Sequence, residues 1–335
     1  MENTKDILLD VRNLKTTFFT KKAEVKAVND VSFHVGRKEV VAIVGESGCG
    51  KSVTQMSIMQ LVQDPPGKIV GGEVFFDGTD ILKLPRNSNA MRKIRGSEIS
   101  MIFQEPMTSL NPVYTIGNQI TEVIMEHSGL SKKEAWEKGV EALESVGIPE
   151  PRMRMKNFPF EMSGGMRQRV LIAIAVACGS KLIIADEPTT ALDVTTQAQV
   201  MDQLMNVVQQ HGTSVLMITH NLGLVTRYAE RIYVMYAGKV VESGTTEEIL
   251  TNPKHPYTKG LLNSVPRMDT SRSEKLIPIQ GAPPDLGHLP DYCYFYPRCP
   301  YATDDCKVKG IPSLDETGTE GHFCACHLFD KECAE

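Results

Sequence analysis

The segment EVVAIVGESGCGKS, residues 39–52, is the strongest indication of the fold of this chain. Its apolar first half predicts a buried strand, and TQMSIMQLV after it predicts a helix. The loop between them matches G-x-x-x-x-G-K-[ST], in which glycines let successive backbone N–H groups point at a chain of phosphates. Lys51 adds positive charge there, and Ser52 offers a hydroxyl to Mg²⁺. We expect a nucleotide to be bound by Gly45, Glu46, Ser47, Gly48, Cys49, Gly50, Lys51 and Ser52.

Three further apolar runs of strand length follow along the chain. They are EISMIFQ (98–104), KLIIAD (181–186) and SVLMITH (214–220). Because segments with helical periodicity separate these runs, the pattern predicts an α/β fold with a parallel sheet.

Two hairpins and a helical insert complete the expected architecture. GGEVFFDGTDI (71–81) predicts antiparallel strands around a DG turn, and RIYVMYAGKVVESG (231–244) predicts a second hairpin. IGNQITEVIMEH (116–127) and KKEAWEKGVEALESVGI (132–148) have the spacing of amphipathic helices. We expect these helices to form an insert between two strands, over about residues 105–165.

Composition and charge narrow the class of protein. With 335 residues, the chain is long enough for one large core and a smaller unit. Its formal net charge of −5 argues against a broad nucleic-acid surface. MENTKDILLD has no secretory pattern, and VLIAIAVACG (170–179) is too short to cross a bilayer. These features predict a cytosolic protein that reaches a membrane only through a partner.

Polar residues stand where the predicted strands end. In KLIIADEP, Asp186 is placed to hold Mg²⁺ through water, and Glu187 is placed to polarise an attacking water. Gln104 ends its own strand and could reach the metal and that water, whereas His220 could contact a γ-phosphate. Ligands bind at the carboxyl ends of strands in such sheets, so we expect these four side chains to share one site.

A second candidate anion site lies in EMSGGMRQR (161–169). Ser163, Gly164 and Gly165 begin a helix that is apolar nearly all round, and the positive end of such a helix needs an anion or a cap. Capping by Ser163 alone is the simpler explanation. Since the lysine loop already binds its own phosphates, a second cradle is useful if it serves a nucleotide held by another subunit.

Six of the eight cysteines lie in the last part of the chain. In a reducing compartment, such clustering suggests a metal site rather than disulfides. The spacing C-x₅-C-x₆-C-x₁₉-C, with Cys326 as the fourth residue, lacks the close pairs of zinc fingers and differs from ferredoxin runs. Zinc, an iron–sulfur cluster and free surface thiols therefore all stay open. The six cysteines are Cys293, Cys299, Cys306, Cys324, Cys326 and Cys333.

Taken in order, these motifs resemble an ABC-type ATPase subunit over roughly residues 8–250. The resemblance is carried by GESGCGKS, Gln104, MSGGMRQR, LIIADEP, ALD and His220. It implies a P-loop NTPase (RecA-like) core with an antiparallel β subdomain and a helical insert. It also implies that Ser163, Gly164 and Gly165 of one subunit close over the ATP of a second, with two ATP molecules sandwiched head to tail.

Two more site residues follow from this resemblance alone. Asp193 of ALD would lie in the loop that crosses between subunits. An aromatic ring near the N-terminus stacks on adenine in this family, and Phe18 matches the family spacing better than Phe19. The signature differs at two positions, MSGGM for LSGGQ, but Ser-Gly-Gly is retained, so we expect ATPase activity.

Three segments resemble the oligopeptide/dipeptide branch of bacterial ABC importers, which also handles nickel; the closest likeness is to dipeptide-importer ATPase subunits. They are QEPMTSLNP (104–112), NPKHPYTKGLLNSVP (252–266) and CYFYPRCPYATDDC (293–306). The resemblance implies a nucleotide-binding domain, 1–250, and a small Cys-rich C-terminal domain, 251–335. Nickel or another solute, and a non-transport ABC ATPase acting on DNA or ribosomes, are the alternatives to peptide import.

The same branch implies partners and a place in the cell. The partners would be a homologous, non-identical ATPase subunit, two membrane permeases and, indirectly, an extracellular solute-binding protein, with no nucleic acid. The chain would be peripheral on the cytoplasmic face of the cell membrane and use ATP and Mg²⁺.

Some members of this branch carry a [4Fe-4S] cluster, which the resemblance places on four cysteines of this chain. Cys324 is the alternative fourth ligand and Cys333 is spare, and we expect the cluster to be a structural staple, with zinc as the alternative metal. The four expected ligands are Cys293, Cys299, Cys306 and Cys326.

Overall fold

The computed structural model describes residues 6–189, 192–264 and 278–329, and these fall into two compact units whose sequences interleave. Unit 1 takes its residues from the N-terminus to Leu8, from 35–40 and from 83–218. Unit 2 takes its residues from 9–34, 41–82 and 219 onward. The chain therefore passes from one unit to the other several times.

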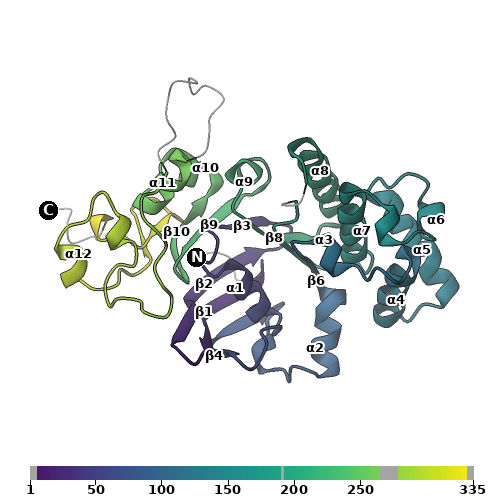
Figure 1. Cartoon of the computed structure of the whole chain (residues 1–335), viewed down its shortest axis with the longest axis horizontal. Coiled ribbons are helices and arrows are strands. Elements are labelled where there is room, and N and C mark those ends of the chain that lie inside the picture. Colours follow the sequence, from purple (N-terminus) through teal and green to yellow (C-terminus); the bar gives the residue numbers. More distant parts are fainter. Residues whose placement is uncertain (1–5, 190–191, 265–277, 330–335) are drawn as a thin grey trace. The chain divides into compact units, whose positions relative to one another are not determined.

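Unit 1 contains a row of parallel strands that confirms the predicted α/β pattern (Figure 1). Leu182 of the middle strand pairs with Ile99 on one side and with Ser214 on the other. All five residues of the middle strand are buried, as expected for a parallel sheet covered on both faces. The strands are β6 (Ile99–Ile102), β7 (Leu182–Asp186) and β8 (Ser214–Thr219).

The helices of unit 1 begin and end at residues that the sequence marks clearly. Thr115 caps α4, which ends at Gly129 in a left-handed conformation, and Ser131 and Glu134 form a capping box at α5. The amphipathic helices expected in the insert are confirmed. The helices are α2 (Asn89–Lys93), η2 (Ile94–Glu98), α3 (Pro106–Ser109), α4 (Ile116–Ser128), α5 (Lys132–Ser145), α6 (Pro151–Arg154), η3 (Pro159–Glu161), α7 (Gly164–Val176) and α8 (Val194–His211).

One sheet of unit 2 is antiparallel, with strand order β2-β1-β4-β5. The predicted DG turn joins β4 to β5: Asp77 and Gly78 have φ of 49° and 78°, the left-handed pair that a tight hairpin requires. The strands are β1 (Ile7–Phe19), β2 (Glu24–Gly36), β4 (Gly67–Phe76) and β5 (Thr79–Asp80).

The other strands of unit 2 are β3, which precedes the glycine-rich loop of residues 45–52 (the phosphate loop), and strands from the C-terminal part of the chain. β3 runs parallel to β9, the predicted hairpin joins β9 to β10, and β12 pairs antiparallel with both β10 and β11. The final third of the sequence therefore adds strands beside β3 within unit 2. The strands are β3 (Val40–Val44), β9 (Arg231–Tyr236), β10 (Lys239–Thr245), β11 (Asp315–Glu316) and β12 (Phe323–Cys324).

Unit 2 also contains short helices. The helix after the phosphate loop ends at Ile58, earlier than TQMSIMQLV predicts, because Gln60 has φ of 50° and Leu61 N–H donates to Met56 O. The helices are α1 (Lys51–Ile58), η1 (Ile81–Lys83), α9 (Leu222–Tyr228), α10 (Thr246–Thr251), α11 (Pro256–Asn263), η4 (Tyr296–Arg298), α12 (Asp305–Val308) and η5 (His327–Phe329).

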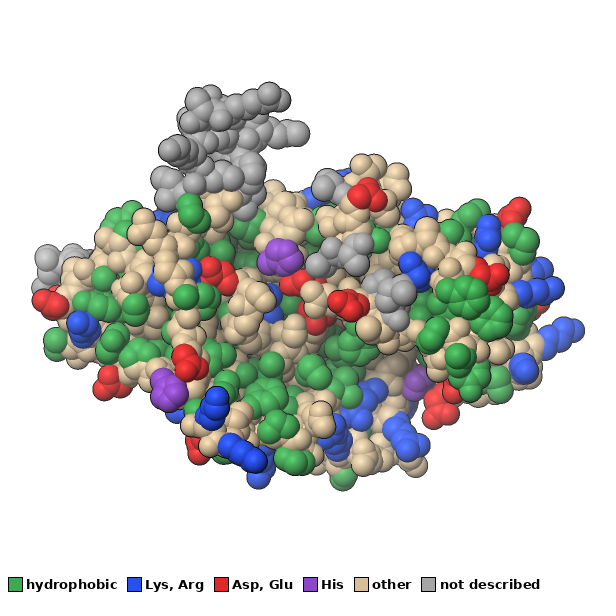
Figure 2. All heavy atoms as spheres, viewed as in Figure 1, with side chains coloured by type: hydrophobic (Ala, Val, Ile, Leu, Met, Phe, Trp, Pro, Cys, Tyr) green, Lys and Arg blue, Asp and Glu red, His purple; other side chains and the backbone are tan. Residues whose placement is uncertain are grey.

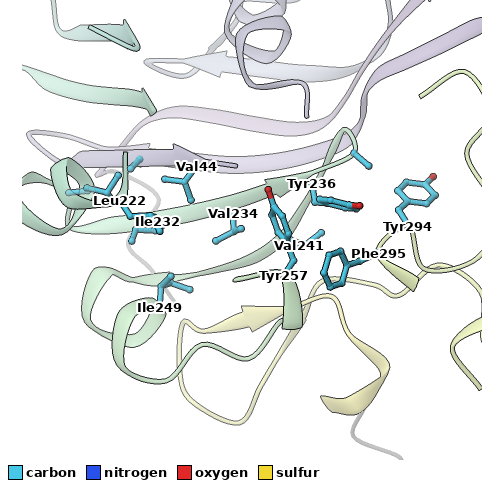
Figure 3. Packing of buried hydrophobic residues seen from close by; sticks show 14 residues of the cluster. Val44, Leu222, Ile232, Val234, Tyr236, Val241, Ile249, Tyr257, Tyr294 and Phe295 are labelled. Atoms are coloured by element: carbon cyan, nitrogen blue, oxygen red, sulfur yellow. The ribbon is translucent and has the colours of Figure 1, made fainter. Parts of the chain in front are cut away.

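An aromatic cluster lies in the core of unit 2 (Figure 3). The ring of Tyr236 on β9 lies 4.6 Å from that of Tyr257 on α11 and 5.3 Å from that of Phe295, centroid to centroid. Val44, at the end of β3, belongs to the same buried cluster. Residues from the C-terminal part of the chain thus pack in one core with the strand that precedes the phosphate loop.

The surface agrees with the mixed composition. Acidic and basic side chains both appear among neutral ones on the face shown in Figure 2. Among the described residues, none of the helices combines the length and the apolar character that crossing a bilayer requires.

Candidate functional site

The phosphate loop connects β3 to α1 in unit 2, as the sequence predicts. Lys51, the first residue of α1, is buried, and its Nζ donates hydrogen bonds of 2.7 Å to Gly45 O and 2.9 Å to Glu46 O. The ammonium group therefore lies against the loop's own backbone carbonyls. This arrangement concentrates positive charge at a helix N-terminus, which suits a phosphate chain.

The loop needs glycine at its last position. Gly50 has φ of 105°, and a Cβ built there would lie 2.2 Å from the carbonyl oxygen of Ala27. Gly48 has φ of 80°, but a Cβ there would meet nothing within 4 Å. Ser47 and Ser52 are exposed, whereas Cys49 is buried and burial raises the pKa of its thiol.

Unit 1 brings together two of the predicted catalytic residues. Gln104 lies just beyond β6 and Glu187 just beyond β7, and Nε2 of Gln104 donates a 2.8 Å hydrogen bond to Oε2 of Glu187. Asp186, the last residue of β7, is buried, whereas the side chain of Glu187 is half-buried. Because β6 and β7 are parallel, their carboxyl ends lie at one edge of the sheet, as expected.

The backbone of Glu187 has an unusual conformation. Its φ is 44°, which is uncommon for a residue with a Cβ, and its N–H donates a 2.8 Å hydrogen bond to Ile218 O on β8. Strain of this kind persists where the surrounding structure enforces it, and it is frequent at active sites. The conformation turns the chain sharply after β7 and holds the carboxylate beside Gln104.

His220 follows β8 directly and is exposed. The next residue, Asn221, caps α9 by accepting a hydrogen bond from the Gly223 N–H. His220 is thus placed at a junction between a strand and a helix, where the sequence predicted it.

The glycine-rich helix start in unit 1 has the predicted form. Ser163 caps α7: its hydroxyl accepts a hydrogen bond from Met166 N–H, and the side chain remains exposed. A Cβ on Gly165 would lie 2.7 Å from Cγ2 of Thr196 on α8, so the second glycine allows the two helices to approach. Helix capping accounts for the presence of serine at position 163. Because the Ser163 side chain is exposed, the N-terminus of α7 is accessible.

Asp193 and Phe18 have local roles in the structure. Asp193 caps α8 by accepting hydrogen bonds from N–H and Oγ1 of Thr196, and these bonds lower the pKa of the exposed carboxyl. Phe18 is half-buried on β1 and packs beside Gly67 of β4, whereas Phe19 is exposed.

The predicted [4Fe-4S] cluster is wrong, and the alternative zinc site falls with it. Among the described residues, no group of three or more His, Cys, Asp or Glu side chains is arranged to hold a metal ion. In the metal-free chain, burial raises the pKa of Cys293 and Cys299 and raises that of Cys326 to about 12, so these thiols are neutral there. Cys306 contacts Thr303, Cys324 is buried on β12, and Cys333 lies outside the described residues.

Two residues that no sequence motif indicates contact the phosphate loop. Arg298 forms an ion pair with Glu46, and the hydroxyl of Tyr257 accepts a hydrogen bond from the Glu46 N–H. Both are more than 200 positions from Glu46, and nothing in their local sequence indicates the contact.

Comparisons with known proteins agree with this geometry. Residues 28–190 match the family model described as ABC transporter, and residues 241–306 match the one described as oligopeptide/dipeptide transporter, C-terminal region. The oligopeptide transport ATP-binding protein AppD of Bacillus subtilis (strain 168) is 51% identical over 328 residues, 98% of each chain. The oligopeptide transport ATP-binding protein OppD of Escherichia coli (strain K12) is 48% identical, over 96% of this chain and 93% of the other.

A solved structure resembles the nucleotide-binding part. It is the dimeric post-hydrolysis state of the ATP-binding cassette MJ0796 bound to ADP and Pi, with a TM-score of 0.63 and 28% identity. The match covers 71% of this chain and 98% of that chain, so the ATP-binding cassette fold is present here almost in full.

Proposed function

This chain belongs to the ABC transporter family, in the branch of oligopeptide and dipeptide transport ATP-binding proteins, and on that premise we propose that it hydrolyses ATP to drive peptide import through partner permeases. The observation that carries the proposal is the likeness over 98% of both chains to an oligopeptide transport ATP-binding protein. The helix-start lysine and the hydrogen-bonded carboxylate supply the chemistry that such an activity requires.

The phosphate loop would bind the triphosphate of ATP. Its backbone N–H groups and the Lys51 ammonium would neutralise the phosphate charge, and Phe18 or its neighbour Phe19 would stack on adenine. The fit is supported by Gly50, because a side chain there would overlap the Ala27 carbonyl oxygen and force the loop to shift. Mg²⁺, when bound by Ser52, Gln104 and, through water, Asp186, would neutralise charge that develops on the γ-phosphate.

Glu187 would act on the attacking water. A carboxylate can orient a water molecule and accept its proton, and the hydrogen bond from Gln104 holds Oε2 of Glu187 in place. His220 would contact the γ-phosphate and stabilise the negative charge that develops on it during hydrolysis. These roles require each side chain to be preorganised, which the strained backbone of Glu187 supports.

The exposed start of α7 would complete the site of a second ATPase subunit. Ser163, Gly164 and Gly165 present a helix N-terminus suited to a γ-phosphate. The relative MJ0796 has been solved as a dimer with ADP and Pi, which supports this arrangement. Asp193 would lie in the connection between the two subunits, and the second subunit would be a homologous, non-identical chain.

The helical insert would transmit the movement to two permeases at the cytoplasmic face of the membrane. Three large apolar side chains in this part of unit 1 are more than half exposed: Val113, Tyr114 and Phe160. Tyr114 also lines, with Thr121 and Met125 of α4, a groove of about 590 Å³. Exposed apolar side chains beside a groove are typical of a docking surface. An extracellular solute-binding protein would deliver the peptide without contacting this chain.

Reconstitution tests the proposal. The chain would be placed in proteoliposomes with its permeases, second ATPase subunit and binding protein, and uptake of labelled peptides of two to five residues would be followed with and without ATP. ATP-dependent peptide uptake that is lost with Lys51→Ala supports the proposal. Uptake of Ni²⁺ but of no peptide, or recovery of the chain from cells with nucleic acid and no permease, would overturn it.

A further inference from the structure

The first residue after Gly45 in the phosphate loop is held from outside the loop by the C-terminal region, residues 246–264 and 278–329. Arg298 forms two parallel hydrogen bonds with the Glu46 carboxylate, NH1 to Oε2 at 2.6 Å and NH2 to Oε1 at 2.9 Å. This bidentate geometry is the strong form of an Arg–carboxylate pair and fixes direction as well as distance.

Arg298 is itself held rigidly. Its side chain is 3% exposed, and its Nε donates a 3.0 Å hydrogen bond to Gln280 O. The guanidinium lies over the rings of Tyr236 and Phe295, and Glu46 raises its pKa, so it stays charged. Since a buried charge left without its partner is costly, the pair constrains Glu46 strongly.

Tyr257 holds the backbone of the same residue. Its hydroxyl accepts a 2.8 Å hydrogen bond from Glu46 N–H, and the residue is fully buried at the start of α11. The ring packs against Tyr236 and Phe295 in the aromatic cluster, as Figure 3 shows. Both the side chain and the main chain of Glu46 are thus attached to one rigid core.

Glu46 connects these contacts to the phosphate-binding groups. Its carbonyl oxygen accepts hydrogen bonds from Lys51 Nζ at 2.9 Å and from Cys49 N–H at 3.3 Å. A shift of Glu46 would therefore move the carbonyl that Lys51 contacts and would alter the turn at Cys49. Small displacements in such a cradle weaken binding because its N–H groups must converge on the phosphates.

From this chain of contacts we propose that Arg298 and Tyr257 are positioning residues, which hold Glu46 and through it keep the phosphate loop in the shape that binds ATP. The C-terminal region thereby sets the affinity of the ATPase for nucleotide. This inference rests on the proposed function, because it requires the loop to bind ATP.

The test compares variants of the full-length chain in Mg²⁺-ATP titration calorimetry and steady-state ATPase kinetics. Arg298→Gln should weaken ATP binding and raise KM about tenfold, the scale of a lost charge-assisted hydrogen bond, while kcat at saturating ATP is retained. Arg298→Lys keeps the positive charge but lacks the two parallel N–H donors of the guanidinium, so its affinity for ATP should lie between those of Arg298→Gln and the wild type. Tyr257→Phe should weaken binding about threefold, since one neutral hydrogen bond is lost.

The matched control is Arg152→Gln, which breaks another bidentate Arg–Glu pair, that with Glu137 in the helical insert, and should leave KM unchanged. A purely structural role would lower the melting temperature and the active fraction without changing KM, and that result would overturn the inference. If Arg298→Gln does not fold, the test rests on Tyr257→Phe. Wild-type affinity for ATP in Tyr257→Phe contradicts the inference. Failure of the wild-type chain to bind ATP would instead refute the proposed function.

Discussion

Gln104 and Glu187, 83 positions apart, meet at one edge of a parallel sheet, where the amide of Gln104 donates a 2.8 Å hydrogen bond to the Glu187 carboxylate. The contact depends on β6 and β7 being neighbours in register, with Ile102 opposite Ala185. An amide donor fixes a carboxylate oxygen without neutralising it, so Glu187 keeps its capacity to accept a proton. The pair therefore joins the predicted metal- and water-binding residue to the predicted base.

Glu187→Gln should slow ATP hydrolysis by about 10²–10⁴-fold, the range that loss of a general base produces. ATP binding should remain near the wild-type value, because the phosphate loop is unchanged, and a closed dimer should accumulate. Phosphate release, calorimetry and light scattering measure the three quantities. Glu105→Gln removes an exposed carboxylate next to Gln104 and should leave turnover unchanged. Full turnover by Glu187→Gln would remove this residue from the mechanism.

Gly50→Ala and Gly48→Ala should differ although both glycines have positive φ. A side chain in the left-handed region costs about 1–2 kcal/mol, and both variants carry that cost. At Gly50 the new Cβ also overlaps the Ala27 carbonyl oxygen, which adds about 1–3 kcal/mol of overpacking. Gly50→Ala should therefore have a lower melting temperature than Gly48→Ala. ATP titration should also show weaker binding by Gly50→Ala than by Gly48→Ala. Equal melting temperatures would contradict the steric account of the loop.

Ser163→Ala should separate capping from a role at a subunit interface. Ser163 caps α7 and Ser131 caps α5 with similar hydrogen bonds, so each alanine variant should lose about 1 kcal/mol of stability. Only Ser163→Ala should also lower the ATPase rate, because only that helix end is proposed to contact a nucleotide. Denaturant unfolding and phosphate release check both effects. If both variants lose ATPase activity only in proportion to their loss of stability, Ser163 acts as a helix cap and has no role at a subunit interface.

Stability should fall between pH 6.5 and pH 4 because of His255. This residue is buried at the start of α11, where its Nδ1 accepts a hydrogen bond from Tyr257 N–H, and burial lowers its pKa to about 4 despite the nearby Glu242 carboxylate. In this interval the unfolded chain binds a proton that the folded chain does not, so acidification favours unfolding. The expected loss from pH 7.5 to pH 5 is about 2 kcal/mol.

His255→Asn retains a capping oxygen but removes the titrating group, so denaturant unfolding at several pH values should show a flatter dependence for this variant. His211→Asn changes an exposed histidine and serves as the control. Equal slopes for wild type and His255→Asn would show that other groups cause the pH dependence.

Much of the fold could be predicted because its signals are local. The short apolar strands β6, β7 and β8 are continuous hydrophobic runs, and the hairpin turn at 77–78 uses Asp and Gly, which accept positive φ. The long strands β1 and β2 were not predicted. They carry polar residues and a register shift near Lys15, so neither shows a clean alternation.

The cysteine cluster shows where a local pattern fails. Its spacing was compatible with a metal site, but spacing along the chain does not say where the side chains lie after folding. A metal site needs several ligands that converge on one point, and among the described residues the structure holds no such group. Cys326 lies in a region whose burial raises its pKa to about 12, a property that no count of intervening residues contains.

The phosphate loop, the acidic strand end and the glycine-rich helix start could be read from residue types, because each depends on residues within a few positions of a strand or helix end. Folding was needed to show that Gln104 bonds to Glu187, that Arg298 and Tyr257 hold Glu46, and that the cysteines form no metal-binding group within the described residues. These outcomes depend on distances across the fold and on burial, which arise when segments far apart in the chain pack against one another.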